Sequence, residues 1–249
     1  IETLFPLAAR IGHRLRKSGL PARPGERLAL ALTELGPGFV KLGQVLSTRA
    51  DLVGEAVASD LSELQDRLAP FPFERARETI ERELGRPLEE VYASFEQTPV
   101  AAASIAQVHF ARTPEGEDVA VKVLRPGVEA AFARDVDLLA WIAKLVERFA
   151  PSLRRLKPQA VVATLAETVR LEMDLRLEAA ACDELAKNFA GDAEFRVPRV
   201  DWTRTAKRTL CTERIHGIPV DERDKLIAAG HDPQEIEARA ARAFFRQVF

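Results

Sequence analysis

Hydrophobic and polar residues follow helical spacing through the first third of the chain and then change to the alternation of short strands. Apolar positions three and four residues apart predict a series of helices, separated by breaks rich in glycine and proline, over residues 2–19, 26–35, 39–52, 55–68 and 73–84. Residues 91–95 and 105–112 alternate as strands do, and a hairpin turn at Pro114 leads into a third strand around residues 119–123. The pattern therefore predicts a helical region followed, near residue 90, by a small antiparallel sheet.

The rest of the chain combines helices with two further strands. A long amphipathic helix is predicted over Val128–Phe149, and its inward-facing residues are expected to be Ala131, Leu138, Leu139, Ile142, Leu145 and Val146. The remaining predictions are a second long helix over residues 159–189, strands over 199–202 and 209–215, and helices over 222–229 and 233–249. A sheet of about five antiparallel strands interrupted by helices belongs to the α+β class.

Composition and charge narrow the classes of partner. Hydrophobic residues make up 47% of the 249 residues and charged residues 30%, an ordinary balance for a globular protein. The formal net charge of -2 creates no broad basic field, so nucleic acid is not an expected partner. The small cluster of Arg204, Lys207 and Arg208 is interpreted as a solvated turn. No apolar run is long enough to span a bilayer, and no signal peptide is visible.

The rarer residues indicate a reducing compartment and a longer protein. The two cysteines, Cys182 and Cys211, lie far apart without a C-x-x-C spacing, and the four histidines are dispersed. We therefore expect neither a disulfide framework nor a metal site within the chain. The only methionine is Met173, and the sequence stops in the middle of a helical pattern, so we expect the chain to be a segment of a longer protein.

A single lysine interrupts the apolar strand Val119–Val123. An isolated ammonium is costly to bury, so Lys122 is expected to face a partner anion. In protein kinases, a lysine in this kind of strand holds the α- and β-phosphates of ATP and pairs with a glutamate on a helix. The alternative is a lysine on an edge strand whose ammonium reaches solvent. The strand alone favours that alternative.

An alanine-rich stretch lies between the first predicted strands and consists of Ala101, Ala102, Ala103 and Ser104. A protein kinase carries its Gly-rich phosphate loop at this place. Small side chains let the backbone approach a ligand closely, but alanine disfavours positive φ, so this loop is expected to be stiffer than a glycine loop. Without other context, the same alanines are equally consistent with the start of a strand or a helical turn.

Lys41 and Gln44 are three residues apart and share one face of a predicted helix. Gly43 lies between them, and a glycine inside a helix suggests close packing against a neighbour. The two polar side chains are candidates to line a polar pocket. The alternative, a surface helix with a chance K-x-G-Q sequence, is favoured by these residues alone.

Three carboxylates occur among apolar residues of the predicted helix over residues 159–189. Asp174 and Glu178 are four residues apart and share a face, whereas Glu172 is offset around the helix axis. One of these carboxylates is a candidate partner for the strand lysine. The alternative is an exposed charged face partnered by Arg170 and Arg176.

Several motifs in a fixed order resemble the UbiB/ADCK family of atypical kinase-like proteins. They are K-L-G-Q at residues 41–44 with S-x-R-x-D at 47–51 and L-Q-D at 64–66, A-A-A-S-I-A-Q-V-H at 101–109, V-A-V-K-V at 119–123, E-M-D at 172–174 with E-A at 178–179, and T-E-R-I-x-G at 212–217. Each motif is weak by itself, but together they are highly specific. Gly54 departs from the family, which commonly has proline there.

The resemblance implies a protein-kinase-like fold in three segments. A helical extension over residues 1–89 carries the K-x-G-Q motif, an N-lobe follows over residues 90–217, and residues 218–249 are the start of a helical C-lobe. In that family the K-x-G-Q helix lies over the active site and occupies space that a protein substrate would need. The catalytic-loop and metal-binding aspartates belong to the C-lobe and do not appear before Phe249. This segment alone is therefore expected to be inactive.

The resemblance also implies roles for individual residues. The residues expected at the catalytic centre are Lys122, Glu178, Lys41, Gln44, Glu172 and Asp174. Among these, Lys122 is the phosphate lysine and Glu178 the helix glutamate paired with it, whereas Glu172 and Asp174 are expected to be partners of Lys41. The residues expected to bind the nucleotide, with backbone groups meeting adenine around residues 213–215, are Ala101, Ala102, Ala103, Ser104, Lys122, Glu213, Arg214 and Ile215.

The function implied by the resemblance is that of an atypical kinase-like, ATP-binding protein with ATPase-type activity that supports ubiquinone or isoprenoid-lipid biosynthesis. The expected cofactors are ATP and Mg²⁺, with metal ligands beyond residue 249. The expected partners are an isoprenoid lipid or quinone precursor and a membrane surface, at a cytoplasmic, membrane-associated location. The alternative is a non-catalytic kinase-fold scaffold or lipid-binding protein, which the basic face of the helix over residues 2–19 favours. An ordinary protein kinase is disfavoured by the missing Gly-rich loop.

Overall fold

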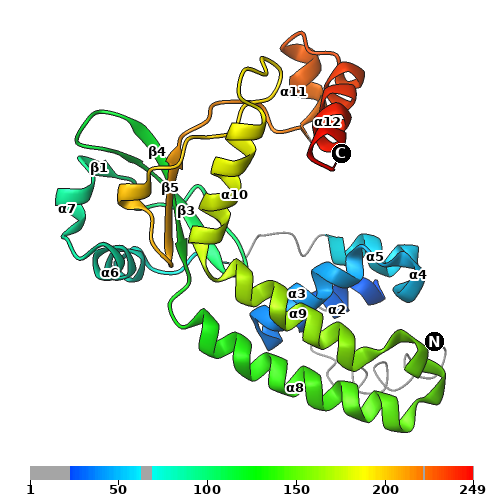
Figure 1. Ribbon diagram of the computed structural model, residues 1–249. Coiled ribbons are helices and arrows are strands. Elements are labelled where there is room, and N and C mark those ends of the chain that lie inside the picture. Colours follow the sequence, from blue (N-terminus) through cyan, green and yellow to red (C-terminus); the bar gives the residue numbers. More distant parts are fainter. Residues whose placement is uncertain (1–22, 63–68, 221, 249) are drawn as a thin grey trace. The chain divides into compact units, whose positions relative to one another are not determined.

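The computed structural model describes residues 23–62, 69–220 and 222–248 (Figure 1). The helix predicted over residues 2–19 and the L-Q-D motif at residues 64–66 lie outside these residues. The chain forms two compact units. A helical unit comprises Ile1–Arg67 and Ala130–Leu165, and a sheet unit comprises Leu68–Glu129 and Ala166–Phe249. The domain boundaries predicted near residues 90 and 217 stay predictions.

The helical unit combines short helices from the start of the chain with parts of two long helices. These elements are α2 (Pro24–Leu35), α3 (Pro37–Ser47), α4 (Ala50–Val53), α5 (Glu55–Ser62), most of α8 (Val128–Phe149), the 3-10 helix η1 (Pro151–Leu156) and the first half of α9 (Pro158–Glu172). Helices α2, α3 and α5 pack on one another. Each contributes an apolar stripe to the contact, and Leu32, Phe39, Val40 and Leu61 are buried there.

Two sequence predictions for these helices are wrong. The helix predicted over residues 39–52 is interrupted, because Arg49 leaves the helical conformation (φ -119°, ψ 59°) before α4 begins. In α8, Leu138 and Ile142 are exposed, whereas Phe132 and Ala143 are buried. Apolar residues extend around more than one side of α8, so their spacing does not identify the side that packs.

The sheet unit is built on five antiparallel strands in the order β1-β3-β4-β5, with β2 also paired to β3. The strands are β1 (Ser94–Phe95), β2 (Ala101–Ala102), β3 (Ala106–Arg112), β4 (Asp118–Leu124) and β5 (Thr209–Glu213). This sheet with its helices confirms the predicted α+β class. Lys122 pairs with Val108 of β3 and Leu210 of β5, so it lies on an interior strand. The alternative of an edge-strand lysine is therefore wrong.

Alternation along β4 separates the two faces of the sheet. Helices α6 (Phe73–Leu84) and α7 (Leu88–Val91) cover one face (Figure 1). The apolar core on that face includes Ile80, Val91, Val119, Val121 and Val123. Lys122 lies on the opposite face, where it contacts α10 (Leu175–Asn188). The strand pattern therefore brings one cation to the α10 face while its neighbours fill the core.

Two predicted strands are shorter than expected. In residues 91–95, only Ser94–Phe95 is a strand, and Val91 ends α7. In residues 199–202, Val200 makes a single bridge to Thr212. A 3-10 helix, η2 (Trp202–Arg204), follows it, because the Asp201 carboxylate accepts a hydrogen bond from the Thr203 N–H (3.0 Å) and turns the chain.

The long helix predicted over residues 159–189 is two helices, α9 and α10. Between them, the Leu175 N–H donates to the carbonyl of Lys207 (2.9 Å), and Asp174 caps α10. A contact with a segment distant in sequence therefore ends one helix and begins another. The chain then continues through β5 to α11 (Arg223–Ala228) and α12 (Pro233–Val248).

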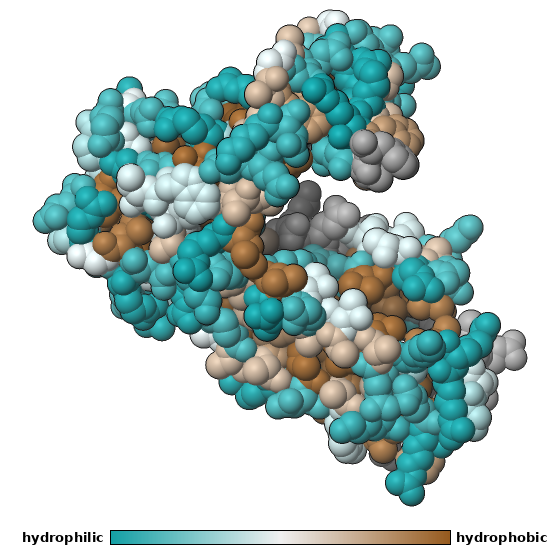
Figure 2. Space-filling model, in the orientation of Figure 1, coloured by the Kyte–Doolittle hydropathy of each residue, from teal (hydrophilic) through white to brown (hydrophobic). Residues whose placement is uncertain are grey.

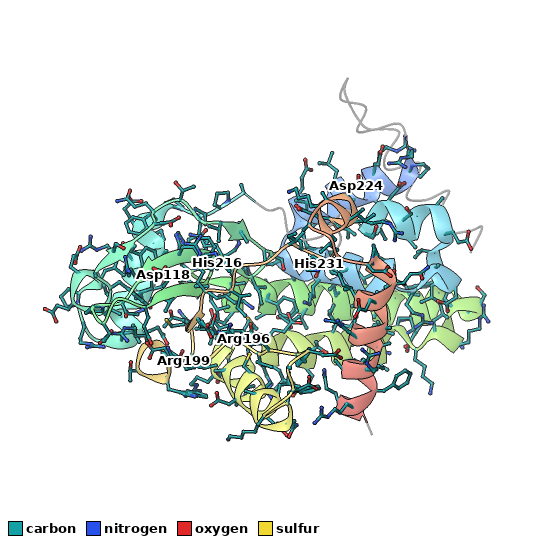
Figure 3. The ribbon with its side chains drawn as sticks, turned by 90° about the horizontal axis from the view of Figure 1, so that it is seen from above. Asp118, Arg196, Arg199, His216, Asp224 and His231 are labelled. Carbon is teal, nitrogen blue, oxygen red and sulfur yellow. The ribbon has the colours of Figure 1, made fainter. Side chains whose placement is uncertain are left out.

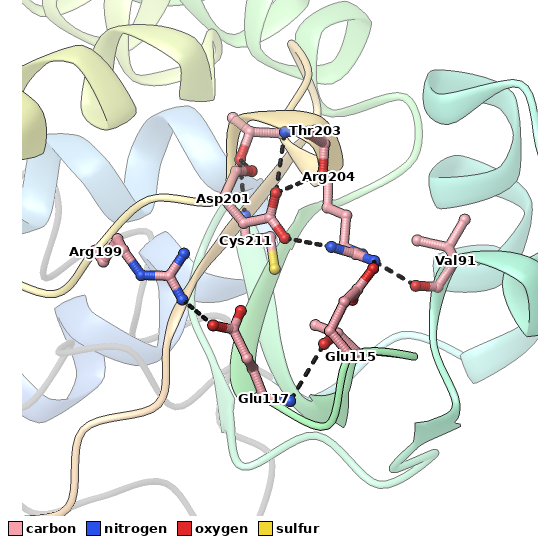
Figure 4. A network of polar contacts seen from close by, with 10 residues as sticks. Val91, Glu115, Glu117, Arg199, Asp201, Thr203, Arg204 and Cys211 are labelled. Atoms are coloured by element: carbon pink, nitrogen blue, oxygen red, sulfur yellow. Dashed lines mark hydrogen bonds and ion pairs between the residues drawn. The ribbon is translucent and has the colours of Figure 1, made fainter.

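Arg204 does not lie in a solvated turn, so that interpretation is wrong for this residue. Its side chain is only 11% exposed and forms ion pairs with Asp201 (2.7 Å) and Glu115 (2.8 Å) (Figure 4). Its Nε donates to the carbonyl of Val91 (3.1 Å). One guanidinium therefore connects η2, the β3–β4 turn and α7. These contacts stabilise the end of the sheet next to the β3–β4 turn.

Candidate functional site

The candidate site centres on an ion pair between Lys122 on β4 and Glu178 on α10. The Lys122 Nζ lies 2.7 Å from Glu178 Oε2 and 3.0 Å from Oε1. The two side chains are 30% and 45% exposed, so solvent reaches the pair. A cation held on an interior strand and still open to solvent is suited to contact a phosphate, while the carboxylate orients it.

The local sequence of α10 explains how Glu178 reaches the sheet. Asp174 caps the helix by accepting a hydrogen bond from the Arg176 N–H (3.2 Å). Leu175 and Ala179 are buried, so their side of the helix packs inward. Glu178 lies in the first turn, beside this buried side, where its carboxylate is directed to Lys122.

Glu172 and Asp174 lie at the junction between α9 and α10. The Asp174 carboxylate contacts the Arg176 guanidinium at 2.6 Å, and this hydrogen bond lowers the pKa of Asp174. Asp174 is therefore ionised at neutral pH and has a cationic partner on its own helix. The predicted partnership of Glu172 and Asp174 with Lys41 stays a prediction.

The alanine-rich stretch forms a tight hairpin between β2 and β3. The Ala103 N–H donates to the carbonyl of Ala106 (2.7 Å) and closes the turn. Among the described residues other than glycine, only Lys157 has a positive φ. The alanines are therefore unstrained here, and glycine is not needed to build the turn.

Two backbone donors at the tip of this hairpin have no acceptor among the described residues. Ser104 and Ile105 are buried, and within the described ranges neither N–H makes a hydrogen bond. Buried N–H groups are nearly always paired, with protein, water or a ligand. Successive N–H groups in a turn form a concavity suited to an anion. The hairpin tip therefore offers two donors to a phosphate oxygen.

The segment Glu213–Ile215 carries the chain out of β5. The Glu213 N–H donates to the carbonyl of Arg199 (2.8 Å), and the Arg214 N–H donates to that of Asp118 (3.0 Å); Figure 3 labels both acceptor residues. In the part of the chain that the structure describes, the Ile215 N–H has no acceptor. Of the three predicted adenine-binding residues, Ile215 therefore has the available backbone donor.

Lys41 and Gln44 lie on α3 in the helical unit, and both are partly exposed. The Gly38 N–H, in the first turn of α3, donates to Asp135 Oδ2 on α8 (2.9 Å). A Cβ atom at Gly38 would lie 2.6 Å from Asp135 Cβ, so glycine is required for this approach. Gly43 is buried, which confirms the close packing expected of it. The proximity of Lys41 and Gln44 to a nucleotide stays a prediction.

Three polar residues near the alanine hairpin have no role predicted from the sequence, namely Gln107, His109 and Arg125. Gln107 Oε1 accepts from the Phe71 N–H (3.0 Å), and its Nε2 lies 2.8 Å from His109 Nε2. Because the Gln107 amide donates to Nε2, His109 Nδ1 carries the proton and donates to the carbonyl of Glu96 (2.8 Å). Burial lowers the pKa of His109, so its ring is neutral. The sequence signal for Gln107 and His109 was that two polar residues occupy alternate positions of a strand that is otherwise largely apolar.

Across residues 23–62, 69–220 and 222–248, no group of three histidine, cysteine, aspartate or glutamate side chains is arranged to hold a metal ion. No helix in these ranges is long and apolar enough to cross a membrane. The expectation of Mg²⁺ ligands beyond residue 249 stays a prediction.

A five-stranded antiparallel sheet whose interior lysine pairs with a helix glutamate is the arrangement of a protein-kinase-like N-lobe. The model of the ABC1 atypical kinase-like domain matches residues 63–249. The chain therefore belongs to the ABC1 atypical kinase-like family, which confirms the resemblance to UbiB/ADCK proteins.

Curated relatives and a solved structure support this assignment. The chain is 46% identical over 225 residues to "Probable protein kinase UbiB" of Marinobacter nauticus, covering 90% of this chain and 41% of the relative. It is 44% identical over 225 residues to the Pseudomonas aeruginosa protein of the same name, covering 90% and 42%. It thus spans about two fifths of the length of these relatives. A structure described as "The complex structure of Rv3197-erythromycin from Mycobacterium tuberculosis" matches with a TM-score of 0.53 and 28% identity, covering 89% of this chain and 52% of that one.

Proposed function

We propose that the protein containing this chain binds ATP with Mg²⁺ and hydrolyses it in support of ubiquinone or related isoprenoid-lipid biosynthesis. The observation that carries the proposal is the Lys122–Glu178 ion pair, which is open to solvent on an interior strand. The relatives named as probable protein kinases UbiB support a kinase-like role. The proposed location is the cytoplasmic side of a membrane, reached peripherally or through segments outside this chain.

In this proposal, residues of the sheet unit bind the nucleotide. Lys122 contacts the phosphates, and Glu178 holds its ammonium in a fixed position. The N–H groups of Ser104 and Ile105 donate to a phosphate oxygen, and the Ile215 N–H donates to adenine. Mg²⁺, when bound, would neutralise phosphate charge.

Residues of the K-x-G-Q helix are assigned to the same site by the family resemblance. Lys41 and Gln44 are proposed to lie near the phosphates, with Glu172 and Asp174 as acidic partners of Lys41. A helix at this place would occupy space that a protein substrate needs. The proposed reaction is therefore transfer of the phosphoryl group to water rather than to a protein hydroxyl.

A thermal-shift experiment with Mg-ATP tests the proposal on the full-length protein. A ligand at about 100 times its Kd stabilises the folded state by about 2.7 kcal/mol, which raises Tm by several degrees. This shift is expected in the wild type and lost in Lys122→Met. Lys225→Met is a matched control, because Lys225 also pairs with a glutamate (Glu222, 2.6 Å) but lies on α11. An equal shift in all three proteins would contradict the assignment of Lys122.

A second candidate function is that of a non-catalytic protein that binds a lipid or another apolar molecule. Apolar side chains of α8 are exposed, namely Leu138, Trp141 and Ile142, and Figure 2 shows apolar residues on the surface of the molecule. The 28% identical protein above was solved in complex with erythromycin, a bulky molecule unlike a protein substrate. Absence of any shift with saturating Mg-ATP, together with sedimentation of the full-length protein with lipid vesicles, would favour this function.

A further inference from the structure

Arg125 follows β4 directly and joins two separate backbone segments of the sheet unit. Its Nε donates to the carbonyl of Ala103 in the alanine hairpin (3.1 Å), and its second terminal nitrogen donates to the carbonyl of Ala69 (2.8 Å). The guanidinium also lies over the Phe71 ring, 5.4 Å from its centroid. One planar group thus connects the tip of the hairpin to the chain that leads into α6.

Strand geometry places this arginine behind the hairpin. The Arg125 N–H donates to the carbonyl of Ile105 (2.8 Å), which extends the β3–β4 pairing by one residue. Alternation then gives Arg125 the same face as Val123, the core face, and not the face of Lys122. Its partner Phe71 packs against the same core. Arg125 is therefore situated to support the hairpin and not to contact the nucleotide on the Lys122 side.

The contacts of Arg125 require an arginine. Within the described ranges, no carboxylate forms an ion pair with it, although its side chain is partly buried. Its charge is instead stabilised by two carbonyl oxygens and an aromatic face. The rigid fork of a guanidinium can reach two carbonyls in different directions, whereas the single ammonium of lysine cannot hold both in this geometry.

We propose that Arg125 is a positioning residue for the alanine hairpin, which it holds at Ala103 so that the N–H groups of Ser104 and Ile105 stay in place for a phosphate. This inference rests on the proposed nucleotide binding. It adds a residue outside the binding surface whose loss loosens the hairpin and weakens nucleotide affinity. Arg125 acts through the backbone of the hairpin and is not itself a catalytic residue.

The test compares Arg125→Lys and Arg125→Met with the wild type in the full-length protein. Arg112→Met is the control, because Arg112 also donates to a backbone carbonyl (Gly116, 3.2 Å) but at the opposite end of β3. Hydrogen exchange of the peptide spanning residues 100–107 reports the hairpin without any nucleotide. Titration with Mg-ATP and Mg-ADP, below the unfolding temperature of every variant, reports affinity. Arg125→Lys keeps the charge and covers the case in which Arg125→Met does not fold.

We expect about tenfold faster exchange of the hairpin and about tenfold weaker nucleotide affinity in both Arg125 variants, with neither change in Arg112→Met. A merely structural role would lower Tm and leave the affinity of the folded protein unchanged. Hydrogen exchange of the hairpin at the wild-type rate in the Arg125 variants would overturn the inference. Faster exchange with unchanged nucleotide affinity would overturn it as well. If the wild type itself binds no nucleotide while the hairpin loosens in the variants, the anchoring by Arg125 stands and the proposed function fails.

Discussion

The ion pair between Lys122 and Glu178 is expected to contribute little to folding and much to nucleotide binding. Its contact is short, 2.7 Å, but the two side chains retain 30% and 45% of their exposure. Ion pairs this open to solvent typically contribute about 0.2–1 kcal/mol, because water screens the charges and two flexible side chains lose entropy. We therefore expect a coupling free energy of about 0.5 kcal/mol in the protein without nucleotide.

A double-mutant cycle measures this coupling from Lys122→Met, Glu178→Gln and the double variant. Urea unfolding of the full-length protein is followed by the fluorescence of Trp202, whose indole N–H donates to Asp183 on α10 (2.7 Å), in a background where Trp141 and any tryptophan outside residues 1–249 are replaced by phenylalanine. The signal then reports the sheet unit. The coupling should shrink when salt is raised from about 0.1 M to about 1 M.

The same variants separate a structural contact from a binding site. Both single variants should lose most of the stabilisation by Mg-ATP, because a lysine without its carboxylate is not held in place for the phosphates. A coupling above about 2 kcal/mol that resists salt would refute the reasoning, since such values belong to buried pairs. Full nucleotide stabilisation in Glu178→Gln would refute the orienting role of Glu178.

Three further predictions concern α3, the buried histidine and the alanine hairpin. Asp135→Ala should lower the free energy of unfolding of the helical unit by about 0.5–2 kcal/mol, because the Gly38 N–H loses its acceptor. Trp141 fluorescence in urea measures this when the protein's other tryptophans, including Trp202, are replaced by phenylalanine, and an unchanged midpoint would contradict it. Burial holds the pKa of His109 below its ordinary 6.5, so below about pH 6.5 the unfolded chain binds a proton that the folded protein does not. The free energy of unfolding, measured in urea, should therefore fall between about pH 7 and about pH 5. The fall should be less steep in His109→Gln. An equal pH dependence in the two proteins would contradict this role of His109. Ala102→Gly should change the ratio of ATP to ADP affinity by adding flexibility to β2, and an unchanged ratio would argue against stiffness as the cause.

Local patterns were sufficient for much of the architecture. The period of apolar residues predicted α2, α6, α8 and the strands β3, β4 and β5, because each of these elements buries one face and its spacing is visible in the sequence. The alternation in β4 also separated Lys122 from the core valines. For the pairing of Lys122 with Glu178, 56 residues apart, the family resemblance was needed, because no local pattern links a strand to a distant helix.

The sequence predictions failed where a contact with a residue distant in sequence overrides the local preference for helix, turn or strand. The apolar spacing through residues 159–189 continues without interruption, but the Leu175 N–H bonds to Lys207 and the helix breaks at Asp174. Arg204 resembles a solvated turn residue in sequence, yet its partners lie on three separate elements. The ranges predicted for short strands were also too long, because a few alternating residues do not show where the pairing with a neighbouring strand ends.

The sequence by itself determined the α+β class, the apolar strand with its one lysine, and the family to which the chain belongs. These follow from periodicity and motif order, which depend on neighbouring residues. Only the tertiary structure decided that Lys122 lies between two strands, that two N–H groups at the hairpin tip have no acceptor among the described residues, and that Arg125 joins Ala103 to Ala69. Such contacts depend on which backbone groups far apart in the sequence come together in the fold. The pattern of apolar and polar side chains does not indicate which carbonyl will accept a hydrogen bond from a given donor.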